Sequence, residues 1–313
     1  VGNSIMRGVL NGALNNTAVG HVALTALTGG TYNVALGSHA GNAITGGHNN
    51  VAIGTNALLV STTADECIAI GKDALAALNH ASTADGTVAI GYSALAALTS
   101  GASNTAIGFH AGKVHTTGGG NTIIGHGAFS DTDVGSLALA SSNNTVIGVD
   151  AMAGTWSNVQ TDSCVAIGHS ALVGALYNVD GTVAIGASAL AALTSGAGNL
   201  AIGYGALKEN VDGSRNMAIG YGAMDETAGG NADGSSDNIF IGFDSGGGDW
   251  HDTASLNNVA IGNYTLDAVM TGASYNVAVG FTALSENTTG ISNVGIGGYA
   301  GMANTTGDYN VAI

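Results

Sequence analysis

The chain has 313 residues, of which 52 are glycine and none is proline, and 45% of its residues are hydrophobic. Five basic residues against 21 acidic ones give a formal net charge of −16. This balance disfavours nucleic acid and anionic membrane surfaces as partners, because both attract clustered Lys and Arg. No apolar run approaches the roughly 20 residues of a membrane span, so we expect no membrane insertion.

One short pattern recurs from end to end of the chain. A clear copy is Asn50-Val51-Ala52-Ile53-Gly54, followed by Ala57 and often by a leucine such as Leu58. The commonest spacing between anchor glycines is 17 residues, and every departure from it is an insertion. The 16 anchors are Gly20, Gly37, Gly54, Gly71, Gly91, Gly108, Gly125, Gly148, Gly168, Gly186, Gly203, Gly220, Gly242, Gly262, Gly280 and Gly297.

A fixed short period over a whole chain predicts a solenoid in which each copy stacks on the next. We therefore predict an all-β fold, a parallel β-roll or β-solenoid of about 16–17 coils with a base period of 17 residues. Residues 1–313 form a single repeat array in this interpretation, with 1–15 as a degenerate first coil. The array stops inside a repeat, so we expect it to be part of a longer chain.

Within each repeat the residues before the anchor glycine predict a short strand. The residue directly before the anchor is Ile, Val or Leu in every copy, and the one before that is Ala in 12 copies. A strand that is apolar on both faces is expected to be buried on both. We expect one face to fill the interior and the Ala-lined face to contact another chain, with the Leu-lined segment as the alternative contact.

The Ala-Leu pair after the anchor is expected to begin a second short strand. Short helical turns at residues 74–78 and 189–193 are the alternative, which their length and their bounding glycines disfavour.

The position four residues before the anchor is Asn in 12 copies, and stacked Asn amides can hydrogen-bond from coil to coil as a ladder. The exceptions are Cys67, Thr87, Cys164 and Thr182, whose spacing indicates that a block of five coils is duplicated. We interpret the two cysteines as small buried substitutes for Asn and expect no disulfide between them.

Insertions lengthen three parts of the array, and loops on a rigid scaffold commonly carry binding residues. Both tryptophans, Trp156 and Trp250, lie there and are candidates for receptor contact. Asp244, Asp249 and Asp252, with Asp225, Glu226, Asp233 and Asp237 before them, are candidate Ca²⁺ ligands because Ca²⁺ prefers oxygen donors. A solvated acidic loop is the competing interpretation, and no other cofactor is predicted.

An aromatic-rich row follows the anchors, and such side chains can stack on sugar rings or simply pack one turn on the next. Three histidines of this row belong to distant coils, so a shared zinc site is not predicted. No nucleophile motif of the Gly-x-Ser-x-Gly kind occurs at a predicted strand–helix turn, and we predict no catalytic residues and no enzyme. The row comprises His21, Tyr92, Phe109, His126, His169, Tyr204, Tyr221, Phe243 and Phe281.

Two families resemble this chain. The pattern Asn-x-Val-Ala-Ile-Gly, as at residues 49–54 and 257–262, resembles the head repeat of trimeric autotransporter adhesins. The longer form Asn-Thr-Ala-Ile-Gly-x-x-Ala with a Thr-Thr-Gly link, as at residues 104–118, looks more like repeats in bacteriophage tail-fibre proteins. The resemblance implies a left-handed parallel β-roll and a side-by-side homotrimer of three chains.

On this basis we expect a structural and adhesive segment of a phage tail fibre, located on a virion, with two further copies of itself and a host cell-surface glycan as partners. A bacterial surface adhesin or extracellular filament of the same fold is the alternative. An ice- or mineral-binding solenoid and a polysaccharide-acting enzyme are further, less favoured interpretations.

Overall fold

The computed structural model describes residues 6–8, 11–78, 85–130, 140–155, 160–227, 234–250 and 252–313. The protein is an all-β parallel β-solenoid with about 16 coils and a period of about 17 residues, as the repeat predicts. It divides into two compact units, Val1–Asp162 and Ser163–Ile313. A single array over residues 1–313, with 1–15 as its first coil, stays a prediction.

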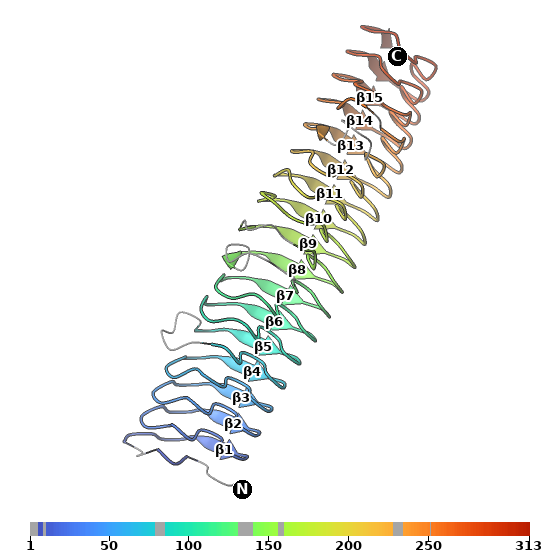
Figure 1. Ribbon diagram of the computed structural model, residues 1–313. Coiled ribbons are helices and arrows are strands. Elements are labelled where there is room, and N and C mark those ends of the chain that lie inside the picture. The colour runs from blue at the N-terminus through green and yellow to red at the C-terminus, as the bar shows by residue number, and fades with distance from the viewer. Residues whose placement is uncertain are drawn as a thin grey trace. The chain divides into compact units, whose positions relative to one another are not determined.

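Each coil of the first unit contributes one short strand. Consecutive strands pair in parallel and in register, so that Ala52 in one strand lies opposite Ala69 in the next. Strands contact only the strands next to them in sequence (Figure 1). The strands are β1 (Thr17–Val19), β2 (Val34–Leu36), β3 (Val51–Ile53), β4 (Ile68–Ile70), β5 (Val88–Ile90), β6 (Thr105–Ile107), β7 (Thr122–Ile124) and β8 (Thr145–Ile147).

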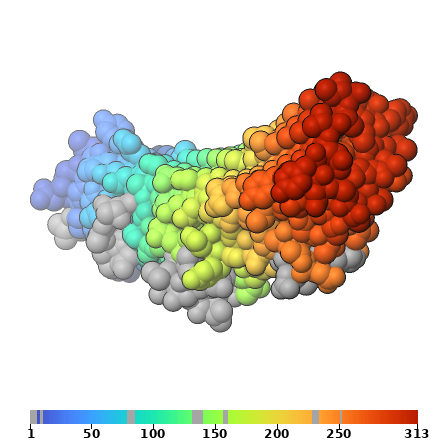
Figure 2. Space-filling model, turned by 90° about the horizontal axis from the view of Figure 1, so that it is seen from above, coloured from blue at the N-terminus to red at the C-terminus, as the bar shows by residue number. Residues whose placement is uncertain are grey.

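The second unit is built in the same way, with Ala201 opposite Ala218. Its coils follow one another in chain order in the space-filling view, from yellow-green to red (Figure 2). Its strands are β9 (Val165–Ile167), β10 (Val183–Ile185), β11 (Leu200–Ile202), β12 (Met217–Ile219), β13 (Ile239–Ile241), β14 (Val259–Ile261), β15 (Val277–Val279), β16 (Val294–Ile296) and β17 (Val311–Ala312).

The two faces of the strands are the reverse of our expectation. The middle residue of each strand, usually Ala, points into the coil and is buried, as Ala52 and Ala201 show. The first and third residues, such as Val51 and Ile53, point outward and are only partly covered. The prediction that the Ala-lined face contacts another chain is therefore wrong, because this face lines the interior of the coil.

The expected second strand is also wrong. Ala57 and Leu58 are both buried, but Leu58 has φ of 51°, which is the left-handed region and incompatible with an extended strand. Its N–H still donates to the carbonyl of Ala74 in the next coil at 3.0 Å. Residues 74–78 and 189–193 form turns rather than helices. The coils therefore stack through turns on this side and through strands on the other.

Two interior positions show paired substitutions in some coils. Phe240 replaces the usual Ala in β13, and Gly246 replaces the usual Leu in the turn that follows. A Cβ atom added at Gly246 would lie 2.6 Å from the Phe240 ring, so a larger residue has no room there. Ile123 and Gly112 form a similar pair between adjacent coils, with the added Cβ 2.9 Å from Ile123 Cδ1. Close packing of the interior thus couples these two positions.

The anchor glycines are required by the backbone. Gly54 has φ of 128°, and a Cβ atom added there would lie 2.6 Å from the carbonyl oxygen of Gly71 in the next coil. The anchors Gly108, Gly203 and Gly262 have φ between 139° and 144° and face the carbonyl of the next anchor in the same way. Any side chain at these positions would separate the coils.

The predicted Asn ladder is confirmed. Asn50 Nδ2 donates to Asn33 Oδ1 of the preceding coil at 3.0 Å and to the carbonyl of Ala64 in the following coil at 2.6 Å. The same coil-to-coil amide bond recurs along Asn238, Asn258, Asn276 and Asn293. Cys67 keeps the backbone half of this pattern, since its N–H donates to Asn50 Oδ1 at 2.9 Å.

Both cysteines are buried, as predicted for substitutes of Asn, and they form no disulfide with each other. Burial raises the pKa of the Cys67 thiol to about 11, and the charges of Asp85 and Asp65 act in the same direction. The thiol is therefore neutral and unreactive at physiological pH.

Candidate functional site

The outward residues of the strands form an apolar surface on each unit, which we call the outer face. It consists of the first and third residue of each strand, almost all of them Val, Ile, Leu, Met or Thr. Leu36 is 48% exposed and Ile261 is 41% exposed, and the same positions recur in register from coil to coil. A continuous exposed apolar surface of this kind marks an interaction site rather than a solvated face.

Aromatic side chains stack as a ladder at the turn after the anchor in several consecutive coils of each unit. In the first unit, Tyr92, Phe109 and His126 stack with ring centroids 5.2 Å apart and interplanar angles of 15° and 9°. In the second unit, Tyr204 stacks on Tyr221 at 5.0 Å, and Tyr221 on Phe243 at 5.4 Å. The interpretation that this row packs one turn on the next is confirmed for these residues.

The second-unit ladder continues through residues that the sequence analysis missed. Tyr264 and Tyr299 lie one position later than the predicted row, and with Phe281 they pack edge-on at centroid distances between 5.3 and 5.9 Å. The rings stay exposed while they stack, with 54% of Tyr221 accessible. The ladder therefore adds apolar surface along one margin of the outer face.

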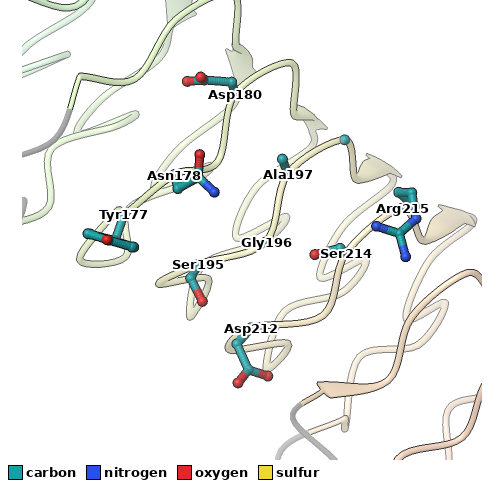
Figure 3. A pocket seen from close by; sticks show the side chains of 10 residues that line it. Tyr177, Asn178, Asp180, Ser195, Gly196, Ala197, Asp212, Ser214 and Arg215 are labelled. Carbon is teal, nitrogen blue, oxygen red and sulfur yellow. The ribbon is translucent and has the colours of Figure 1, made fainter.

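A polar groove of about 580 Å³ crosses three successive coils of the second unit. Figure 3 shows Tyr177 and Arg215 at its two ends, Ser195 and Ala197 between them, and Asp180 and Asp212 on opposite sides. The groove was not predicted from the sequence. Its lining consists of Tyr177, Asn178, Asp180, Ser195, Gly196, Ala197, Gly198, Asp212, Ser214 and Arg215.

The groove exists because the middle coil lacks side chains where its neighbours have them. In several coils the residue six before the anchor carries an oxygen that accepts a backbone N–H from the preceding coil, as when Asp65 accepts His48 N–H at 2.6 Å. Asp180 and Ser214 occupy this position on either side, whereas the middle coil has Ala197. Gly196 and Gly198 flank it with φ of 103° and 71°. A repeat-by-repeat alignment of this position would have shown the gap.

Backbone hydrogen bonds hold the floor of the groove. Tyr177 and Ser195 form a parallel bridge. Gly198 N–H donates to the Asp180 carbonyl at 3.2 Å, and Arg215 N–H donates to the Ala197 carbonyl at 3.1 Å. The Arg215 guanidinium turns to the next coil, where it makes two hydrogen bonds of 2.6 and 2.8 Å to Asp237. This pair holds the pKa of Asp237 below its ordinary value.

A second polar cluster consists of Asp225, Asp244 and Asp267 in the turns that follow β12, β13 and β14. Burial raises the pKa of Asp225 to about 6, and the charges of Glu226 and Asp244 raise it further. Burial likewise raises the pKa of Asp267 to about 6, with the Asp244 charge adding to it. Asp267 was missed although it shares with Asp225 the position five after the anchor. Asp225 and Asp267 therefore gain protons near pH 6.

The predicted calcium ligands are not gathered in this way. Asp244 contributes to the carboxylate cluster, while Asp237 is paired with Arg215. Within the described ranges, no group of three or more His, Cys, Asp or Glu is placed to hold a metal ion. Asp233 lies outside the described residues. The structure thus does not bring Asp244, Asp249 and Asp252 together as a metal site.

The structure describes only one of the two tryptophans that were candidates for receptor contact. Trp250 is 0% exposed and packs edge-on against Phe240 with ring centroids 5.5 Å apart. Its ring is buried beside Phe240 and has no surface to offer a receptor, so its place as a candidate for receptor contact is corrected. Trp156 lies outside the described residues, and its role stays a prediction.

Two histidines of the row, His21 and His126, have local partners. His21 packs on His39 with ring centroids 5.5 Å apart, and His126 Nδ1 lies 4.0 Å from Asp150 Oδ1.

No helix in the described ranges has the length and hydropathy needed to cross a membrane.

Comparison with protein-family models finds no match for this chain, and comparison with curated proteins finds none either. The resemblances to tail-fibre and adhesin repeats therefore stay predictions from the sequence. What the structure establishes is the β-solenoid itself, the outer face with its aromatic ladder, and the groove.

Proposed function

We propose that this chain is a structural and adhesive segment of a fibre in which three copies pack side by side through their outer faces. The observation that carries the proposal is the outer face, which stays apolar and partly exposed along every coil of each unit. In a solenoid that stood alone in water, a large part of the Val, Ile and Leu side chains at these positions would stay exposed. Burial against a second and third copy supplies the reason for them.

The apolar surface still exposed on this face can offset much of the free energy that association costs. Complete burial of a Val, Ile or Leu side chain contributes about 1.5–3 kcal/mol, so the 41% of Ile261 that is still exposed corresponds to about 1 kcal/mol. With two such residues in each strand and eight or nine strands in each unit, each unit offers on the order of 10 kcal/mol. This is comparable to the about 4–15 kcal/mol that association costs.

The finer features of the proposal come from the sequence resemblance. They are left-handed coils, a threefold arrangement, and a place on a virion as part of a phage tail fibre. A bacterial surface adhesin or extracellular filament uses the same outer face in the same way and is the alternative. Either role is mechanical and adhesive rather than enzymatic: the stacked coils supply rigidity, and three copies of a weak contact raise avidity.

The mass of the purified protein in solution tests this proposal. Light scattering should give three times the 30.3 kDa of one chain, independent of concentration in the micromolar range. A monodisperse species of one chain would contradict the proposal, because it would leave the outer face uncovered.

A further inference from the structure

We propose that the groove between Tyr177 and Arg215 binds a neutral saccharide, an inference that rests on the proposed adhesive function and gives it a site. The groove lies in the second unit and is formed by the coils that lead into β10, β11 and β12. Its volume of about 580 Å³ is within the range of small-molecule sites.

The polar groups of the groove match the chemistry of a polyol. Asp180 and Asp212 are exposed and lie on opposite sides of the groove (Figure 3). A carboxylate only accepts hydrogen bonds, and sugar hydroxyls can donate to it. Such charge-assisted bonds are stronger than neutral ones. The hydroxyls of Ser195 and Ser214 can either donate or accept, so they adapt to the remaining sugar hydroxyls.

Tyr177 supplies the apolar part of a saccharide site. Its side chain is at one end of the groove and is 52% exposed. An aromatic ring that combines an apolar face with a phenolic hydroxyl can pack on the C–H face of a sugar and also bond its edge. The parallel bridge between Tyr177 and Ser195 fixes the backbone beneath the ring, which reduces the entropy lost on binding.

The charges favour a neutral ligand over an acidic one. Two carboxylates line the groove, and its single cation, Arg215, is neutralised by the two bonds to Asp237. The net charge of −16 adds a long-range repulsion of anions. An acidic sugar would therefore meet repulsion at the groove with no cation left to pair with it.

The first experiment compares three proteins on a panel of immobilised neutral and acidic oligosaccharides. Ala197→Trp fills the groove. Ala102→Trp is the matched control, because Ala102 also lies six residues before its anchor and follows a glycine with φ of 105°, close to the 103° of Gly196. Wild type and Ala102→Trp should retain neutral oligosaccharides, and Ala197→Trp should bind them at least tenfold more weakly.

Two further variants keep the inference falsifiable if circular dichroism shows that Ala197→Trp does not fold. Tyr177→Ala and Asp180→Asn leave the backbone of the groove intact, and each should weaken binding about tenfold. The inference is overturned if wild type retains no neutral oligosaccharide, if it prefers acidic ones, or if the folded groove variants bind as wild type does.

The solution mass and the saccharide binding of the same samples distinguish failure of the saccharide site from failure of the proposed fibre. If the wild-type mass is trimeric and neutral saccharides are not bound, the saccharide site is wrong and the fibre stands. If the mass is that of one chain while binding depends on the groove, the fibre is wrong and the site stands.

Discussion

Replacing His115 with Asn should remove an acid-induced loss of stability that the buried imidazole causes. His115 is 3% exposed, and its Nε2 lies 3.1 Å from the carbonyl oxygen of Gly118. Burial lowers the pKa of His115 from 6.5 to about 4. The folded protein therefore keeps this ring neutral at a pH at which the unfolded chain has already protonated it.

The sign and size of the change in stability follow from this difference in pKa between the folded and unfolded states. Between pH 6.5 and pH 4 the unfolded state binds one more proton than the folded state, so the free energy of unfolding falls as the pH falls. The full shift corresponds to about 3 kcal/mol, of which about 2 kcal/mol is lost by about pH 5. Above pH 7.5 the contribution of His115 to the pH dependence should vanish.

Asn is a suitable replacement because other coils already use it. Asn210, Asn287 and Asn304 also lie seven residues after their anchors, and each donates Nδ2–H to the carbonyl three residues later, at 3.3, 3.0 and 3.0 Å. His115→Asn thus keeps the hydrogen bond to Gly118 and removes the titrating ring.

The assay is urea unfolding of wild type and His115→Asn at pH 7.5 and pH 5. The wild type should lose about 2 kcal/mol more than the variant between these two conditions. His126→Asn, which removes an exposed ring, controls for a general effect of removing a histidine. Equal losses in wild type and His115→Asn would refute the reasoning, since they would mean that the buried ring is protonated without penalty.

Two further predictions concern the second unit. Phe240→Ala should lower the free energy of unfolding by about 3–5 kcal/mol, because it opens a cavity beside Trp250. Adding Gly246→Leu should recover part of this loss by restoring the usual Ala and Leu pair. No recovery of stability in the double variant would contradict the coupling of these two positions. Asp267→Asn should raise the melting temperature at pH 7.5 and change it little at pH 4. The folded-state pKa of Asp267 is raised from 3.8 to about 6, so its carboxyl stabilises the fold only while protonated and loses that contribution as pH rises through 6. An equal change at both pH values would point to a cause other than ionisation.

The repeat was sufficient to predict the β-solenoid, its period, the Asn ladder and the buried cysteines. Each of these features depends on contacts between equivalent positions of adjacent coils, as between Asn33 and Asn50, so the spacing along the chain determines them. The direction of the strand faces could not be predicted in this way. Val51, Ala52 and Ile53 are all apolar, so their sequence alone does not tell which of them points inward.

The missing second strand and the groove escaped prediction for other physical reasons. Leu58 has a side chain common in strands, but the turn holds its backbone at φ of 51°, a conformation that its residue type does not signal. The groove depends on the absence of an oxygen-bearing side chain at Ala197, where Asp180 and Ser214 carry one in the neighbouring coils. This absence is visible only after the coils are placed in register. The burial of Trp250 follows from its contact with Phe240 rather than from its position in an insertion.

The central claim is that the outer face is where copies of this chain meet, and a pair of charge substitutions tests it most directly. Ile219→Asp places a carboxylate on the outer face in β12, whereas Ala191→Asp makes the same charge change at a partly exposed position in the turn after β10. By light scattering, wild type and Ala191→Asp should both have three times the mass of the 30.3 kDa chain, and Ile219→Asp should shift toward one chain. A wild-type mass of one chain, or an Ile219→Asp variant that keeps the wild-type mass, would contradict the account.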